Sequence, residues 1–156
     1  RAVYIDMSSI RFCDRELLER LKKVHYVREH IEKRLAEIDA FNRERGFDQE
    51  MPINGRRLTN VGVFRAYLQG YLRDKPEVHP DLTFLVRQLQ PTPKGLPIEI
   101  YVFSRNQEWA AYEGIQADIF DHVLAAVPIF DLQVFQEPSG GDVRALAGSL
   151  RAPAGG

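Results

Sequence analysis

The chain has 156 residues, of which 44% are hydrophobic and 28% charged, and its formal net charge is −1. This length and composition are typical of one soluble globular domain with its own core. The near-neutral charge disfavours a protein that binds the phosphate backbone of nucleic acid. The single cysteine excludes an intrachain disulfide, and no apolar run approaches the ~20 residues needed to cross a bilayer. Because a strand pattern begins at Arg1 rather than after a Met, we expect the chain to be a piece of a longer protein.

The first part of the chain predicts a strand and then a long helix. Residues 1–12 alternate apolar and polar side chains, which favours a half-buried strand. Residues 14–45 carry apolar side chains at every third or fourth position, between Asp14 as N-cap and Gly46 as a C-terminal stop. At ~1.5 Å per residue this helix would measure ~48 Å. We therefore expect its far half to project or to contact another chain, with a kinked helix lying on its own domain as the alternative.

The later patterns complete an alternation of strands and helices. They predict a polar loop at 46–60 and then a helix that Thr59 or Asn60 caps and Lys75-Pro76 ends. A strand at 82–89 follows, and a Pro/Gly turn at 91–95 connects it to a strand at 98–103. The last two elements are a helix at 104–127, which Pro128 stops, and a strand at 130–135. Ser104 and Gln107 fit a capping box for the last helix. Gly62 and Gly70 weaken the earlier helix, so either glycine could mark the close approach of another backbone.

The order of these elements predicts an α+β fold. When the long helix is set aside, the order is β-α-β-β-α-β, which is that of a ferredoxin-like two-layer sandwich. The long amphipathic helix then enlarges the first helical region of this fold. We expect one domain at 1–138, with the enlarged helix and loop at 14–60. From Glu137 onward the sequence lacks apolar periodicity, so residues 139–156 are predicted to be a flexible tail.

No set of residues has the spacing of a catalytic, cofactor-binding or metal-binding site. His25 and His30 are five residues apart, which is wrong for two ligands on one helical face, while Asp118 and His122 lie four apart without further ligands. Cys13 precedes a helix but has no neighbouring base, so we interpret it as a small apolar residue. No glycine-rich phosphate loop is present. We therefore expect no enzyme, no cofactor and no metal.

Three aromatic residues fall on the phase of the sheet opposite its apolar face. They are Tyr4, Tyr101 and Phe103. RNA-recognition domains stack bases on such a face, but their aromatic consensus is missing and the net charge is wrong for RNA. Burial against a neighbouring subunit or domain explains these residues with fewer assumptions, so we expect no nucleic-acid partner.

Four segments of the chain resemble a known family. RAVYIDMSSIRFCD, RLTNVGVFRAYLQGYL, LTFLVRQLQPTPKGLPIEIYVFS and AYEGIQADIFDHVLAAVPIFDLQVFQEPSG are similar to the cytoplasmic C-terminal region of small-conductance mechanosensitive channels of the MscS-like family, most of all its YbdG-type branch. The resemblance extends to about residue 140. It implies an inner-membrane channel that bilayer tension opens during hypo-osmotic shock.

The resemblance also implies partners. A β-rich domain would lie upstream, its last strand leading into Arg1, and transmembrane helices would precede it. The subunits would form a homo-oligomeric ring, typically a heptamer, in which this domain is a wall of a cytoplasmic vestibule with side portals. The shortest family members close the ring with a C-terminal strand, for which the tail here shows no pattern.

Two other functions remain as alternatives on the same fold. One is a ferredoxin-like regulatory or small-ligand-binding module. The other is an acylphosphatase-like enzyme, which is disfavoured because the segment SSIRFCD supplies Arg11 but no glycine-rich phosphate cradle. A deep pocket lined by converging titratable groups would argue against the wall interpretation.

Overall fold

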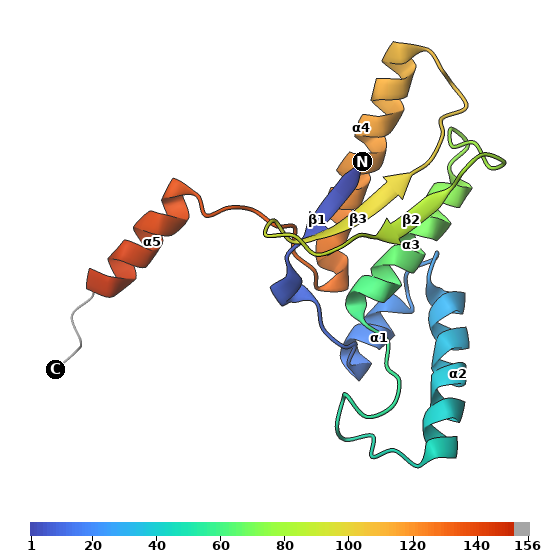
Figure 1. The fold of residues 1–156 in the computed structure, drawn as a ribbon, viewed down its shortest axis with the longest axis vertical. Helices are drawn as coiled ribbons and strands as arrows, with labels where there is room; N and C mark the ends of the chain where they lie inside the picture. Colours follow the sequence, from blue (N-terminus) through green and yellow to red (C-terminus); the bar gives the residue numbers. More distant parts are fainter. Residues whose placement is uncertain (152–156) are drawn as a thin grey trace.

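The computed structural model describes residues 1–151, which form an α+β domain with a C-terminal helix outside it (Figure 1). In chain order the elements are β1 (Ala2–Ile5), the 3-10 helix η1 (Met7–Ser9), α1 (Arg15–Leu21), α2 (Arg28–Arg45), α3 (Asn60–Asp74), β2 (Leu85–Gln88), β3 (Leu96–Tyr101), α4 (Trp109–Ala126), the 3-10 helix η2 (Val127–Phe130) and α5 (Gly140–Arg151). No helix within 1–151 is both long and apolar enough to cross a membrane.

The sheet has the topology of a split βαβ motif. Its three strands are antiparallel in the order β1-β3-β2, so β3 lies between the two strands that α1 to α3 connect. Beyond β1, a short extended stretch takes the fourth position: the N–H of Asp6 donates to the carbonyl of Gln133 (2.8 Å), and the N–H of Phe135 donates to the carbonyl of Tyr4 (2.9 Å). The predicted ferredoxin-like α+β fold is confirmed.

The first and the last predicted strands are shorter than the sequence pattern indicates. The first ends at Ile5, because the side chain of Asp6 accepts the N–H of Ser8 (2.9 Å) and starts η1. The predicted strand at 130–135 is wrong over its first part, because Pro128 lies in the first turn of η2 and Asp131 takes a left-handed conformation (φ 54°) that redirects the chain. Only residues 133–135 remain to pair with β1.

The core lies between one face of the sheet and the helices α3 and α4, which pass behind it in Figure 1. Alternate strand residues point into this layer, as the period of two predicts. The rings of Phe64 and Phe130 meet edge to face at 5.3 Å in its middle. The largest fully buried side chains are those of Ile5, Leu17, Leu21, Val27, Ile31, Val63, Phe64, Leu68, Leu72, Ile98, Phe130 and Leu132.

The single long helix predicted at 14–45 is wrong. The structure divides it into α1 and α2 around a turn at residues 22–27, where Val27 is fully buried and the guanidinium of Arg28 donates to the carbonyl of Lys22 (2.8 Å). A Cβ at Gly70 would lie 2.9 Å from the Cβ of Tyr26, so this glycine lets the turn approach α3 closely. The alternative of one kinked helix comes closer, because the chain does bend here, but it divides into two helices, and α2 buries Ile31, Ile38 and Asn42 against the same chain.

The segment after Glu137 differs from the expected irregular tail. Residues 140–151 form α5, which buries no residue and stands clear of the rest of the domain in Figure 1. Its start is fixed by Ser139, whose Oγ accepts the N–H of Asp142 (3.2 Å) while the Asp142 carboxylate accepts the N–H of Ser139 (2.8 Å). The predicted tail residues 152–156 lie outside the described residues.

Candidate functional site

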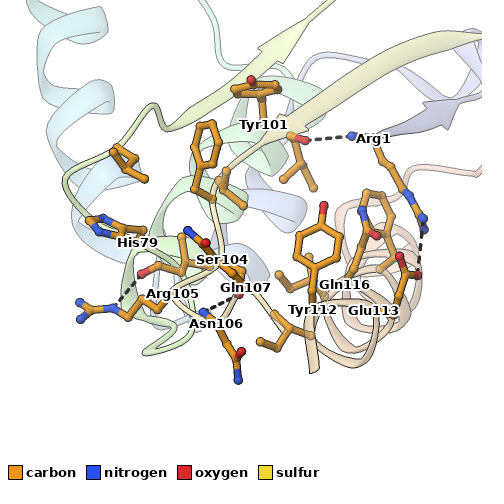
Figure 2. A pocket seen from close by; sticks show the side chains of 18 residues that line it. Arg1, His79, Tyr101, Ser104, Arg105, Asn106, Gln107, Tyr112, Glu113 and Gln116 are labelled. Carbon is orange, nitrogen blue, oxygen red and sulfur yellow. Dashed lines mark hydrogen bonds and ion pairs between the residues drawn. The ribbon is translucent and has the colours of Figure 1, made fainter. Parts of the chain in front are cut away.

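An open cleft lies between the end of β3, the loop that follows it and the first half of α4 (Figure 2). Its volume is about 960 Å³. The apolar part of its lining comes from the end of the sheet, from Val78 and Leu82 before β2, and from the inward face of α4. These apolar residues are Val78, Leu82, Ile100, Val102, Phe103, Ile115, Ile119 and Phe120.

The polar groups at the rim of the cleft are occupied by their own loops. The ring Nδ1 of His79 accepts the N–H of Asp81 (3.2 Å), and the Nε of Arg105 donates to the carbonyl of Val78 (3.4 Å). The guanidinium of Arg1 lies 3.9 Å from the carboxylate of Glu113. These titratable groups bind neighbouring atoms separately and do not converge on one point, so the rim has no nucleophile-and-base arrangement.

The predicted capping box at Ser104 and Gln107 is wrong. The N-cap of α4 is Glu108, which makes no side-chain cap bond. The Oγ of Ser104 instead accepts the N–H of Asn106 (3.1 Å), and the side chain of Asn106 accepts the N–H of Glu108 (2.9 Å). Two successive turns therefore bring the chain from β3 to the helix, and they form one wall of the cleft.

The sheet edge beside the cleft has free backbone groups. Ile100 and Arg1 exchange two hydrogen bonds, of 2.8 and 3.1 Å, at the end of the β1–β3 ladder. Successive residues of a strand turn their N–H and C=O to opposite sides. Phe103 therefore faces the β2 side, where its carbonyl accepts the N–H of His79 (2.6 Å), while Val102 faces the side that β1 leaves vacant. Among the described residues, no backbone group of Val102 has a hydrogen-bond partner.

A buried amide carbonyl adds to this free polar surface. The Oε1 of Gln116, on the wall formed by α4, is shielded from solvent and has no hydrogen-bond partner within 1–151. Polar atoms buried in this way are normally satisfied by a donor. The cleft therefore combines an apolar lining with backbone and amide groups that can bind a polypeptide.

Aromatic rings lie on the uncovered face of the sheet, as the sequence predicts. Tyr4, Tyr101 and Phe103 are 41%, 47% and 40% exposed. The rings of Tyr101 and Phe103 meet edge to face at 5.6 Å, and both residues also line the cleft. The aromatic surface thus continues from the open face of the sheet into the mouth of the cleft.

One exposed aromatic residue was missed by sequence reasoning. Trp109 has the phase of the apolar face of α4, yet it is 77% exposed at the first turn of the helix. No local signal in the sequence separates it from the buried positions of α4, because its exposure depends on how far the helix extends beyond the sheet.

The residues considered for chemistry from the sequence lie apart from the cleft. Cys13 is buried, and desolvation raises the pKa of its thiol to about 11, so it stays neutral at physiological pH. His122 contacts the hydroxyl of Tyr67 at 2.5 Å and stacks on Tyr71 at 4.0 Å. Desolvation, and then the charge of Lys75, lower its pKa. No group of three or more potential metal ligands occurs in residues 1–151.

The sheet has the strand order of a split βαβ motif, with helices on one face and exposed aromatic rings on the other. This arrangement defines a ferredoxin-like α+β domain with free contact surfaces. The family model described as "Mechanosensitive ion channel MscS, C-terminal" matches residues 1–128. The chain belongs to this family, which is a family of channel domains and not of enzymes. No solved structure gives a significant match.

Proposed function

We propose that this domain forms part of the wall of an oligomeric vestibule in a mechanosensitive channel that responds to osmotic shock. The observation that supports this most directly is the set of exposed aromatic rings of Tyr4, Tyr101 and Phe103 on a domain of this family. Large apolar patches on an uncovered sheet face are typical of protein–protein contact surfaces. We further propose the YbdG-type branch, a heptameric ring, and a position on the cytoplasmic side of the inner membrane.

The edge of β3 supports a second part of this proposal. If a β-rich domain precedes this one, the residues before Arg1 continue along β3 and reach the unpaired backbone of Val102. In an antiparallel ladder the N–H and C=O of Val102 are then both satisfied. The upstream domain would thereby fill the part of the cleft nearest the sheet.

The channel function is tested by recording from patched membranes that contain the full-length protein. We expect a conductance that opens with membrane tension, and its absence would overturn the proposal.

The wall role is tested in the same protein with Tyr101→Ser and the matched control Leu124→Ser, since the two side chains are 47% and 44% exposed on different surfaces. We expect Tyr101→Ser alone to reduce the fraction of assembled rings measured by light scattering in detergent. Equal assembly of both variants would contradict the wall role.

A regulatory or small-ligand-binding module is the second candidate, and the cleft is the observation that favours it. Its volume of about 960 Å³ lies within the range of small-molecule sites, and its apolar lining carries a few polar groups. Calorimetric titration of the chain with pools of metabolites tests this candidate. Tight, stoichiometric binding that Gln116→Leu abolishes would favour the ligand-binding module over the vestibule wall.

A further inference from the structure

Helices α3 and α4 carry charges of opposite sign. Helix α4 contains the acids Glu113, Asp118 and Asp121 but no lysine or arginine. Helix α3 contains Arg65 and Arg73, and its only acid is its last residue. Within residues 1–151, neither arginine forms an ion pair, and the Nε of Arg65 is buried without a hydrogen-bond partner. The charges of both helices are therefore available to a second protein.

Each helix repeats its charges at the same interval. Arg65 and Arg73 are eight residues apart, and so are Glu113 and Asp121. Eight residues rise ~12 Å and turn about 80° beyond two full turns, so each pair lies on one side of its helix. We call these the basic side of α3 (Arg65 and Arg73) and the acidic side of α4 (Glu113 and Asp121). Asp118 lies outside the acidic side, about 140° from Glu113 around the helix.

The contact between the two helices shows where these sides point. The helices meet where His122 of α4 contacts the hydroxyl of Tyr67 of α3 at 2.5 Å and stacks on Tyr71 at 4.0 Å. The residues of the acidic side lie about 100–180° from His122 around α4, and those of the basic side lie about 120–160° from Tyr67 around α3. Both sides therefore face away from the neighbouring helix of the same domain, so α3 and α4 cannot pair these charges with each other.

The strands place the two sides at opposite flanks of the domain. The guanidinium of Arg73 lies over the ring of Phe84, 4.4 Å from its centroid, directly before β2. The carboxylate of Glu113 lies 3.9 Å from the guanidinium of Arg1, directly before β1, and such an exposed pair contributes little. Since β1 and β2 lie on opposite sides of β3, the basic side borders one flank of the sheet and the acidic side borders the other.

We propose that the basic side of α3 in one copy of this chain binds the acidic side of α4 in the next copy, an inference that rests on the ring proposed above. Two different surfaces meet in this contact, which is the head-to-tail arrangement that a ring of more than two subunits needs. The two helices run in opposite directions along the sheet (Figure 1). Arg65 therefore lies opposite Asp121 of the next copy, and Arg73 lies opposite Glu113. Because the two intervals are equal, both pairs form in one register, and Leu124, about one turn beyond Asp121, lies outside the paired stretch.

Disulfide trapping in the full-length protein tests the contact. Gln69 and Ala117 are exposed and lie midway between the charges of the basic and the acidic side, so they face each other across the contact. A variant that carries both Gln69→Cys and Ala117→Cys is expected to give linked multimers under mild oxidation, whereas neither single variant does. Linked dimers from a single variant would indicate a two-fold contact between identical surfaces and would overturn the proposal. The native Cys13 does not compete, because it is buried and its thiol has a pKa of about 11.

Light scattering on the same variant separates this contact from the ring on which it rests. A double-cysteine variant that assembles but gives no linked multimers overturns the contact alone. A full-length protein that stays monomeric overturns the ring, and this contact with it.

Charge reversal tests the pairing of opposite signs. In the double-cysteine variant, Arg73→Glu should reduce the yield of linked multimers several-fold, because two acids then face each other. Adding Glu113→Arg should restore the yield, since the signs are opposite again. The control Lys33→Glu makes the same change of charge at an exposed site of α2 and should leave the yield unchanged. A yield that is insensitive to Arg73→Glu, or that Glu113→Arg does not restore, contradicts the pairing.

Discussion

Replacing Asn60 should destabilise the domain more than its position at the start of a helix suggests. The residue is fully buried. Its side-chain oxygen accepts the N–H of Arg11 (3.0 Å) and that of Val61 (2.9 Å), and its Nδ2 donates to the carbonyl of Ser9 (2.9 Å) and, more weakly, to that of Asp131 (3.4 Å). One amide thus joins the segment after β1, the start of α3 and the segment after η2.

Asn60→Ala removes all of these bonds and leaves at least two backbone groups, the N–H of Arg11 and the carbonyl of Ser9, without their partner. A stranded buried polar group costs about 1–3 kcal/mol, so we expect a loss of about 2–4 kcal/mol in the free energy of unfolding. Urea denaturation should show this as a lower midpoint with an unchanged slope. The control Asn106→Ala removes one exposed turn bond and should cost less than about 1 kcal/mol.

The Asn60→Asp variant refines this test. A carboxylate can still accept the N–H of Arg11, but it cannot donate to the carbonyl of Ser9, and it is buried without a counter-charge in contact. We expect it to be at least as destabilising as Asn60→Ala at pH 7. If Asn60→Ala lowers stability no more than Asn106→Ala does, the apolar core alone holds the three segments together and the reasoning is wrong.

Four further variants test other parts of the fold. Gly95 has φ 97°, and a Cβ there would lie 2.5 Å from the carbonyl oxygen of Ile5, so Gly95→Ala should lower the free energy of unfolding by at least about 1–3 kcal/mol. The control Gly114→Ala has open space around it and should instead stabilise α4 by about 0.5–1 kcal/mol. Equal shifts of the two variants in thermal melts would contradict this. Burial opposes ionisation of the Asp131 carboxyl, but hydrogen bonds from two arginines outweigh this effect and lower its pKa. The carboxylate therefore contributes to the free energy of unfolding above the unfolded pKa of about 3.9, and this contribution is lost as the pH falls through the folded pKa. Asp131→Asn should therefore lower the urea midpoint more at pH 7 than at pH 3, and a constant difference would refute this. Asn42→Ala removes two bonds to the backbone of the 46–58 loop and should speed amide hydrogen exchange there, with exchange at wild-type rates as the contrary result.

Local patterns predicted the elements whose ends are set by nearby residues. Thr59 caps α3 through the N–H of Gly62 (3.1 Å), and Lys75 ends the helix, both as the sequence indicates. The β2–β3 hairpin follows from its Pro/Gly turn, where Gly95 closes the connection with Thr92. Each of these boundaries has a residue with a strong conformational preference at the position where the chain turns.

Boundaries set by tertiary contacts were not predictable. No glycine or proline marks the turn at residues 22–27, where Val27 is buried in the core and Tyr26 packs against Gly70 of α3. The exposed apolar residues of α5 were overlooked because their spacing is sparse and glycines surround them. At the cleft, the sequence indicated the exposed rings of Tyr101 and Phe103, but not the buried, unpartnered side-chain oxygen of Gln116, which depends on how α4 packs.

Satisfied polar groups and exposed apolar groups lie in different parts of the domain. Inside the domain, polar side chains such as Asn42 and Asn60 are bound by several partners, which fixes loops and segments in place. Exposed apolar groups lie elsewhere, namely the rings of Tyr101 and Phe103 and the stripe of Val143, Leu146 and Leu150 on α5. An apolar face is stabilised when protein covers it, because the side chains leave water.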